Sequence, residues 1–283
     1  MNILSIQSHV AYGHVGNSAA VFALQRLGCE VWPVHTVQFS NHTGYGAWQG
    51  DVFPAHRLAA VIDGIAALGV LARCDGVLSG YLGSVATGDA ILTAAARVKT
   101  ENPEARWCCD PVIGNRSRGA FVREGVAEFM RERAVPAADV VTPNHFELEA
   151  LTGCESRDIA ALLAAVDVLR ARGPGTVLVT SVCTQATPAD CVDVVASARE
   201  GAFLVRTERL DTPANGAGDL IAALFFFHWL RTRDAAAALA SAASSVFGLL
   251  RRTRDAGSAE TVLIAAQEEL VAPSQRLVPV PIT

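Results

Sequence analysis

Asp219 stands directly after two glycines and before a long apolar run, in the segment NGAGDLIAALFFFHWL. Pro213, Gly216 and Gly218 interrupt whatever precedes them, and helix formers and aromatic residues follow, so we expect a helix to begin near Ala217. The first N–H groups of a helix have no partner inside it, and glycines leave them open to a phosphate. A carboxylate beside them can take a proton from an attacking hydroxyl, which is the chemistry of phosphoryl transfer.

A second interpretation of this segment is purely structural. Glycines interrupt many loops, and an Asp in the first turn of a helix interacts favourably with the helix dipole, by a few tenths to ~1 kcal/mol. A carboxylate at this position would also repel a phosphate at rest. An isolated Gly-x-Gly-Asp segment fits both interpretations, so the rest of the chain has to decide between them.

The composition excludes several classes of function. The 283 residues are 51% hydrophobic, which is enough for a substantial core, and the net charge is −5. A mildly acidic chain without basic runs has little affinity for nucleic acids or anionic membranes. Lys99 is the one lysine among 23 basic residues, so a Walker-type phosphate loop and a Schiff-base lysine are nearly excluded.

The cysteines and the N-terminal segment predict a compartment. The seven cysteines are odd in number and scattered, and their spacing fits neither a zinc site nor a disulfide framework. The segment MNILSIQSHV has no basic region, and no apolar run reaches the ~20 residues of a membrane span. We therefore expect a soluble cytoplasmic protein with no membrane and no nucleic-acid partner.

The elements that must position Asp219 follow from an alternation along the chain. Short runs rich in Val, Ile, Leu and Cys are each followed by a stretch with helical periodicity, which indicates βαβ units around a buried parallel sheet. These runs are residues 2–7, 76–80, 106–112, 139–144 and 176–181. We expect one α/β domain that spans residues 1–283.

Other segments predict the borders of the sheet. Residues 30–40 form a longer strand that contains Pro33, which favours an edge position or an irregular start. Residues 191–207 are typical of a hairpin that turns at Glu200–Gly201 and gives the sheet an antiparallel edge. Two Ala-rich amphipathic helices are expected at residues 234–250 and 258–270.

Polar segments follow the apolar runs, at the points where the strands should end. They are QSHVAYGHVGNSAA, SNHTGYG, SGYLGS, CDPVIGN and TPNHFELEALTG. In open α/β sheets, ligands bind outside the carboxyl ends of the strands. The sequence therefore predicts a site assembled from several loops.

In order along the chain, IQSHV, GHVGNSAA, VQFSNHTGYG, LSGYLGS, DPVIG, TPNHFELEALTG and NGAGD resemble the pyridoxal kinase family of the ribokinase superfamily. The likeness covers essentially the whole chain, and the ordered set is specific where GAGD alone is not. It implies a three-layer α/β/α ribokinase-like fold, with a central mostly parallel sheet, and a homodimer. It also implies transfer of the γ-phosphoryl group of ATP to the 5′-hydroxyl of pyridoxal with Mg²⁺, and leaves open a monovalent cation such as K⁺.

The resemblance assigns roles at the two ends of the reaction. It makes the backbone of Gly216, Ala217 and Gly218 the anion hole and Asp219 the general base. Hydroxyls for the ring nitrogen and the phenolic oxygen, and an aromatic face for stacking, suit a pyridine. The residues implied to bind the vitamin, together with Asp219, are Ser8, Thr43, Gly44 and Tyr81.

On the nucleotide side, the resemblance implies that Asp110 and Glu147 hold Mg²⁺, through water, because hard oxygen ligands suit this ion. The spacing from Asn144 to Glu147 also fits a helix capping box, with Asn144 or Thr142 as the cap. The residues implied to bind ATP are Asp110, Thr142, Glu147, Thr180, Thr207, Glu208, Arg209 and Leu210.

The chain departs from the family pattern at three places. Thr180 stands where a lysine is frequent, and the loop of residues 207–213 is short, which predicts weaker ATP binding or a compensating role for Arg209. Ala120 replaces a cysteine that some members carry, so covalent capture of the aldehyde is in doubt there.

Other functions remain to be separated from this one. A kinase for hydroxymethylpyrimidine or a sugar would share the fold, and the missing lysine would suit a vitamer-binding protein without catalysis. A nicotinamide dehydrogenase is disfavoured, because GHVGNSAA does not have the Gly-x-Gly-x-x-Gly spacing. His9, His14 and His42 are loop histidines, which more often hold a loop by hydrogen bonds than catalyse.

Overall fold

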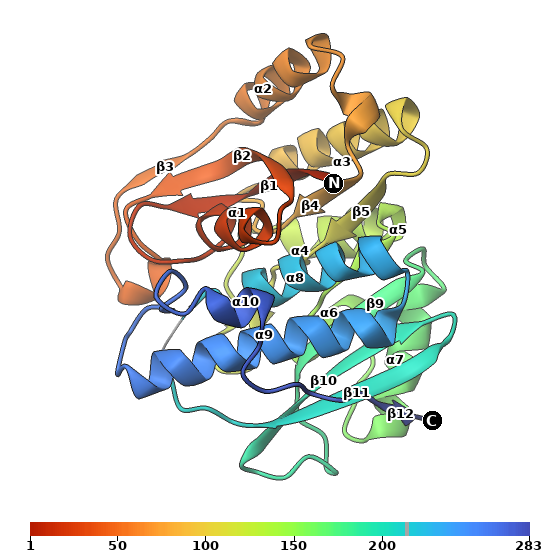
Figure 1. Cartoon of the computed structure of the whole chain (residues 1–283). Coiled ribbons are helices and arrows are strands. Elements are labelled where there is room, and N and C mark those ends of the chain that lie inside the picture. Colours follow the sequence, from red (N-terminus) through yellow and green to blue (C-terminus); the bar gives the residue numbers. More distant parts are fainter. Residues whose placement is uncertain (213–214) are drawn as a thin grey trace.

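The computed structural model describes residues 1–212 and 215–283, so Pro213, which the sequence predicted to break the chain before the helix, lies outside the described residues. A ten-stranded sheet runs through the molecule in the order β12-β11-β10-β9-β8-β5-β4-β1-β2-β3 (Figure 1). Its strands are β1 (Asn2–Val10), β2 (Glu30–Phe39), β3 (Gly50–Val52), β4 (Gly76–Ser79), β5 (Arg106–Cys109), β8 (Val140–Val141), β9 (Thr176–Val182), β10 (Cys191–Ala198), β11 (Gly201–Glu208) and β12 (Val280–Ile282).

The centre of the sheet is parallel, as predicted. Strands β9, β8, β5, β4, β1 and β2 pair in parallel, and β10, β11 and β12 continue the sheet as antiparallel strands on one side. The expected hairpin is present, with a turn between Ala198 and Gly201. A second antiparallel edge, β3 against the end of β2, was not predicted.

Pro33 has the position that its missing N–H requires. It pairs with Ser5 of β1 on one side, and β3 covers only the segment Val37–Phe39 of β2 on the other. The other side of β2 at Pro33 is therefore not covered by β3, which is where a strand tolerates proline. The prediction of an edge is confirmed for this part of the strand.

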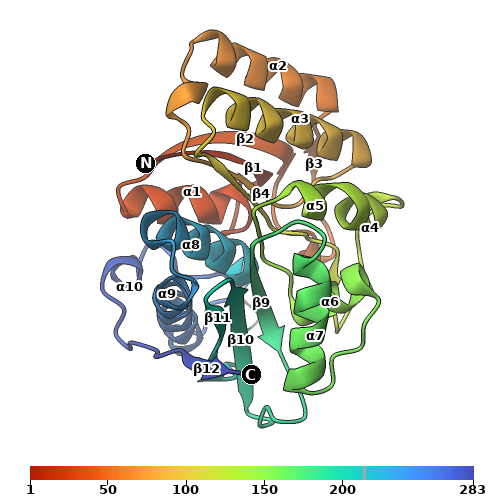
Figure 2. The same cartoon turned by 90° about the vertical axis from the view of Figure 1, so that its right-hand side faces the viewer.

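Helices cover both faces of the sheet and complete three layers (Figure 2). One buried cluster joins Leu4 and Ile6 of β1 to helices α2, α3, α4, α6 and α7, and the other joins Ile3 of the same strand to helices α1, α8 and α9. The alternation of side chains along β1 thus serves two cores. The helices are α1 (Asn17–Arg26), α2 (Ala55–Ala67), α3 (Val85–Glu101), α4 (Val126–Phe129), α5 (Val135–Ala137), α6 (His145–Thr152), α7 (Ile159–Arg170), α8 (Ala217–Thr232), α9 (Ala235–Asp255) and α10 (Glu268–Val271).

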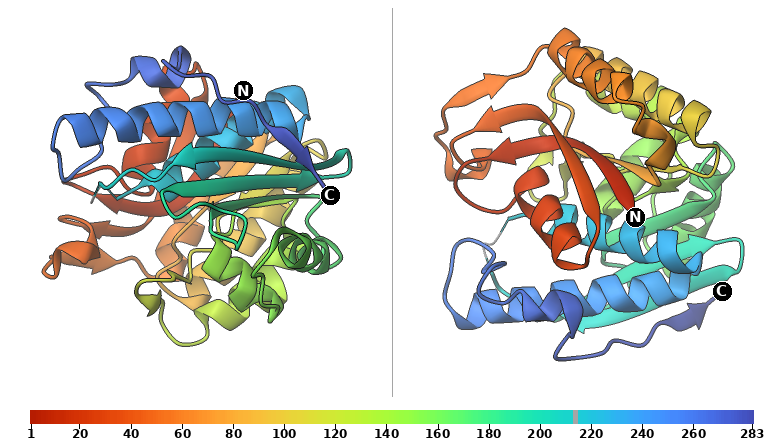
Figure 3. Two further views of the ribbon diagram at one scale, coloured as in Figure 1. Left: turned by 90° about the horizontal axis from the view of Figure 1, so that it is seen from below. Right: turned by 45° about the horizontal axis from the view of Figure 1, so that its top comes forward.

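The C-terminal region departs from the prediction. Helix α9 begins at its cap, Asp234, as expected, but the helix predicted at residues 258–270 is wrong: bends, irregular backbone and turns occupy residues 258–267, and only α10 is helical. The Thr253 hydroxyl accepts the Val262 N–H, and the Thr261 hydroxyl donates to Asn215. These side-chain contacts outweigh the helical periodicity of the segment, which leaves the end of α9 and folds back along this helix to α10 (Figure 3).

Two small features complete the fold. Strands β6 (Gly114–Asn115) and β7 (Gly119–Ala120) form a short hairpin apart from the main sheet. A single turn of 3₁₀ helix, η1 (Thr43–Tyr45), lies between β2 and β3. Within residues 1–212 and 215–283, no helix combines the length and the apolar character needed to cross a bilayer.

Candidate active site

Helix α8 begins at Ala217, where the sequence placed it. Gly216 caps the helix with φ 89°, and a Cβ atom at this position would collide with the carbonyl oxygen of His14. Both the left-handed backbone and the close approach require glycine. A Cβ atom on Gly218, in contrast, would meet nothing within 4 Å, so the first turn of the helix faces open space on that side.

Two cavities flank this helix start. The aromatic cavity, which Phe39, Trp48, Tyr81 and Phe121 border, measures about 360 Å³ and includes Gly216 and Asp219 in its wall. The hairpin cavity, between the β10–β11 hairpin and helices α8 and α9, measures about 240 Å³ and includes Ala217 and Gly218. The four residues of the predicted anion hole and base thus divide between the two cavities.

The aromatic cavity brings together most of the residues predicted to bind the vitamin. Ser8, Thr43 and Tyr81 border it together with Asp219. The Thr36 hydroxyl donates to the Tyr81 carbonyl oxygen at 2.8 Å and holds that loop. Gly44 is not part of the cavity wall; its N–H donates to His42 Nδ1, which closes the turn.

Several residues of this cavity were missed by the sequence analysis. The Trp48 ring lies 4.0 Å from the Phe39 ring, centroid to centroid, and the Arg118 guanidinium lies 5.0 Å from the Phe121 centroid. Arg123 borders the cavity as well. The sequence gives little indication of Trp48 and Phe121, because both stand in connecting segments. In the structure their side chains are 40% and 44% exposed, which is high for aromatic residues.

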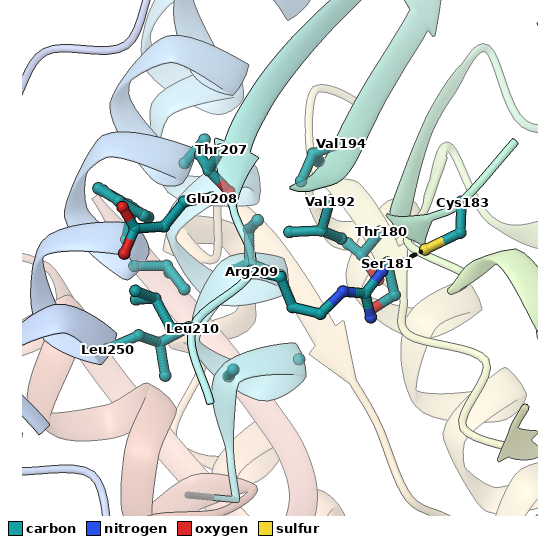
Figure 4. Close-up of a pocket in the computed structure, with 16 residues that line it drawn as sticks. Thr180, Ser181, Cys183, Val192, Val194, Thr207, Glu208, Arg209, Leu210 and Leu250 are labelled. Carbon is teal, nitrogen blue, oxygen red and sulfur yellow. Dashed lines mark hydrogen bonds between the residues drawn. The ribbon is translucent and has the colours of Figure 1, made fainter. Parts of the chain in front are cut away.

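The hairpin cavity contains five of the residues predicted to bind ATP: Thr180, Thr207, Glu208, Arg209 and Leu210 (Figure 4). Arg209 reaches across it and donates through Nη2 to Cys183 Sγ at 2.9 Å and to the Cys191 carbonyl oxygen at 3.0 Å. The remaining wall is mainly apolar, with Val192, Val194, Phe247 and Leu250. Such a wall suits a flat heterocycle, and the guanidinium beside it suits a phosphate.

Ser181 adds a local strain to the hairpin cavity. Its φ is 52°, although it is not a glycine, and it lies in β9 directly after Thr180. Residues in this conformation cost on the order of 1–3 kcal/mol and concentrate at functional sites. Ser181 stands where the register of β9 against β10 shifts, and it borders the cavity.

The carboxyl group of Asp219 has an altered proton affinity. Desolvation raises its pKa to about 6, and the backbone N–H groups of Gly16 and of Asp219 itself oppose the rise. The group is therefore ionised at neutral pH and can still hold a proton under mildly acidic conditions. A pKa near the working pH is what a general base needs.

Asp110, Thr142 and Glu147 border neither cavity. They are buried side by side behind the helix start, and the Thr142 hydroxyl donates to Asp110 Oδ1 at 2.8 Å. Burial raises the pKa of Asp110 well above its usual range, and the neighbouring charges of Glu147 and Asp219 add to the effect.

Glu147 forms the capping box that the sequence left open, with Asn144 as the cap. Its Oε2 accepts the Asn144 N–H at 2.8 Å, and its Oε1 accepts the N–H groups of Ile113 and Gly114 at 2.9 and 3.2 Å. The carboxylate therefore joins helix α6 to the start of the β6–β7 hairpin. Both oxygens of this carboxylate already accept hydrogen bonds.

The donor set fits a hydrated cation better than a directly bound one. Within the described ranges, no three His, Cys, Asp or Glu side chains are grouped as metal ligands. Glu147 and Asp219 nevertheless act on Asp110 as like charges and raise the energy of ionising it. A divalent cation that keeps its waters would relieve this repulsion without requiring direct contact.

Comparisons with known proteins agree on one family. Residues 69–263 match the family model described as phosphomethylpyrimidine kinase. The pyridoxal kinase PdxY of Granulibacter bethesdensis is 57% identical over 278 residues, which cover 97% of each chain. The pyridoxal kinase of Leishmania donovani in complex with ADP superposes with a TM-score of 0.92 at 27% identity, covering 100% of this chain and 99% of that one. Its complex with ADP and pyridoxamine superposes with a TM-score of 0.90 at 27% identity and the same coverage.

Proposed function

This chain belongs to the pyridoxal kinase family and is a kinase, and on that premise we propose that it transfers the γ-phosphoryl group of ATP to the 5′-hydroxyl of pyridoxal. The observation that carries the proposal is the shared helix start. Gly216 and Asp219 border the aromatic cavity, and Ala217 and Gly218 border the hairpin cavity. A hydroxyl in one cavity and a phosphate in the other would meet at the same helix N-terminus.

In the proposed reaction, Asp219 orients the 5′-hydroxyl and accepts its proton as the new O–P bond forms and the bond to ADP breaks. The amides of residues 216–218 and the positive end of α8 stabilise the charge that develops on the transferred group. This transition state is loose, so placement and fixed N–H donors supply most of the catalysis and no lysine is required.

The ligands are assigned to the cavities by their chemistry. Pyridoxal lies in the aromatic cavity, with Tyr81 as a stacking surface and Ser8 and Thr43 as hydrogen-bonding partners. ATP lies in the hairpin cavity, where Arg209 takes the place of the lysine that Thr180 replaces. The solved complex of the Leishmania donovani enzyme with ADP and pyridoxamine supports two ligand sites in one such fold.

Asp110 and Glu147 would hold Mg²⁺ through its waters, with Thr142 supporting Asp110. Mg²⁺ supplies neutralisation of the phosphate charge. A requirement for K⁺, a homodimer, a single domain and a cytoplasmic location stay predictions. Sedimentation of the pure protein would check the homodimer, and assays with and without K⁺ would check the cation.

A hydroxymethylpyrimidine kinase is the second candidate, because the matching family model carries the description phosphomethylpyrimidine kinase. Its substrate is also a flat ring with a hydroxymethyl group, and it would fit the same cavity. A sugar is disfavoured by the aromatic wall, and a vitamer-binding protein without catalysis is set aside because the chain is a kinase.

The test is a substrate panel. The pure protein is incubated with MgATP and with pyridoxal, pyridoxine, pyridoxamine or hydroxymethylpyrimidine, and the phosphorylated product is separated and weighed by mass spectrometry. We expect the highest kcat/KM for pyridoxal. A clear preference for hydroxymethylpyrimidine would establish the second candidate, and no product from any of the B6 vitamers would contradict the proposal.

A further inference from the structure

Glu260 lies in the segment between α9 and α10 and reaches two distant loops. Its Oε1 accepts the Tyr45 hydroxyl at 2.6 Å, and its Oε2 accepts the His14 N–H at 3.3 Å. The residue is 9% exposed, and a Cβ atom on Gly13 would collide with its carboxylate. The carboxylate is thus fitted between the loop after β1 and the loop after β2.

Each of these loops contributes to the aromatic cavity. Tyr45 ends the turn η1, whose first residue, Thr43, borders the cavity. His14 packs its carbonyl oxygen against Gly216, and the Gly16 N–H faces the Asp219 carboxylate. A displacement of Glu260 would therefore move both the loop that carries Thr43 and the surroundings of Asp219.

Thr261 extends the connection to the anion hole. Its hydroxyl donates at 3.0 Å to the carbonyl oxygen of Asn215, the residue before Gly216, and the residue is 1% exposed. The dipeptide Glu260–Thr261 therefore contacts three segments that are far apart in sequence. They are the loop after β1, the turn η1 and the start of α8.

We propose that Glu260 is a positioning residue for phosphoryl transfer: it holds the loops after β1 and β2 against each other around the acceptor hydroxyl, while Thr261 fixes the anion hole. The inference rests on the proposed function, because it assigns these loops to the substrate. Hydrogen bonds to a charged acceptor are stronger than neutral ones, which suits a carboxylate that joins two loops.

The contact itself has a spectroscopic signature that does not depend on turnover. The hydrogen bond to Glu260 raises the pKa of Tyr45 to about 12. In Glu260→Ala, the pKa of Tyr45 should fall toward its usual value near 10, and tyrosinate absorbance should rise earlier in an alkaline titration. The difference between Glu260→Ala and the double variant Tyr45→Phe/Glu260→Ala isolates Tyr45, since the chain has only three tyrosines.

Kinetics then separate positioning from stability. Tyr45→Phe removes one hydroxyl and should raise KM for pyridoxal roughly five- to tenfold, the size of one typical net hydrogen bond, with KM for ATP unchanged. Thr261→Val should mainly lower kcat, since it frees the Asn215 carbonyl beside the anion hole. Glu260→Gln keeps one acceptor and should be milder than Glu260→Ala, which should show both effects.

Tyr12→Phe is the matched control, because Tyr12 neighbours Tyr45 with its ring 6.3 Å away but is 62% exposed. Its kinetics should equal those of the unchanged protein. Lower melting temperatures with unchanged KM and kcat in Tyr45→Phe and Glu260→Ala would overturn the inference. An unchanged protein that does not phosphorylate pyridoxal would contradict the proposed function instead, and an unmoved Tyr45 titration would still reject the contact independently.

Discussion

Asp219 combines a catalytic advantage with a structural cost. Desolvation raises its pKa to about 6, because the carboxylate gives up water beside the helix start. At neutral pH the group is ionised and basic enough to accept a proton, whereas a fully hydrated Asp would be a much weaker base. The same desolvation means that the folded protein would be more stable without the charge.

The pH dependence of the unchanged enzyme follows from this pKa. The base must be unprotonated, so kcat/KM for pyridoxal should be nearly constant above about pH 7, half-maximal near pH 6, and lower by about tenfold per pH unit well below that. A pH profile of initial rates at saturating MgATP checks the prediction. Constant activity down to about pH 4, the ordinary range of an Asp, would mean that Asp219 is not desolvated as described.

Tyr81 is expected to be the main stacking surface for the ring. Tyr81→Ala removes an aromatic face from the cavity wall and should raise KM for pyridoxal by roughly ten- to a hundredfold, since the burial and stacking are worth ~1.5–3 kcal/mol. The KM for ATP should stay the same. An unchanged KM for pyridoxal would place the ring elsewhere.

At the scale of elements, the start of α8 uses its two glycines for different reasons. Gly216 has a left-handed backbone and lies against His14, whereas Gly218 has a helical backbone and faces the open hairpin cavity. The backbone conformation therefore requires glycine at position 216, whereas glycine at position 218 leaves space for the ligand. Sequence alone assigned both to the anion hole without this distinction.

Paired alanine variants separate the two roles. Gly216→Ala should lower the free energy of unfolding by about 1–3 kcal/mol, because the strain and the clash with His14 have no relief. Gly218→Ala should keep or slightly raise the melting temperature and raise KM for ATP, because its methyl group enters the nucleotide space. Equal losses of stability in both variants would contradict this division.

A second contrast lies between Asp110, which follows β5, and Glu147, in the first turn of α6. Both Asp110→Asn and Glu147→Gln should weaken the use of MgATP more than the binding of pyridoxal. Asp110→Asn should raise the melting temperature, because burial and like charges disfavour its ionised form. Glu147→Gln also removes a desolvated charge and can keep the capping box, but its NH2 group must face backbone N–H donors, so its melting temperature should rise less. Loss of pyridoxal affinity with normal MgATP kinetics would remove the pair from the nucleotide side.

At the scale of the whole molecule, the sequence predicted the elements that depend on residues close together in the chain. The apolar runs gave the parallel strands, and the glycines gave the start of α8. Strands β3 and β12 are three residues long and pair with strands across a loop or far along the chain, while β6 and β7 are two residues long and pair only with each other. Segments this short show no hydrophobic periodicity, so they cannot be predicted from it.

The same reasoning explains the misses in the site and near the C-terminus. Trp48 and Phe121 border the aromatic cavity because two loops fold over it, and neither residue lies in a regular element of the main sheet. The segment of residues 258–270 has a helical pattern, but Glu260 and Thr261 bind loops 46 to 246 residues away. Long-range polar contacts of this kind are invisible to a pattern read along the chain.

The most direct test of the central claim is Asp219→Asn, assayed for turnover and melting temperature together. We expect normal binding of both substrates, a kcat lower by about 10² to 10⁴, and at pH 7 a free energy of unfolding higher by on the order of 1–3 kcal/mol. That gain should shrink as the pH falls below 6, where the native carboxyl is already protonated. A variant that turns over pyridoxal at the normal rate and melts lower than the unchanged protein would show that Asp219 only caps the helix.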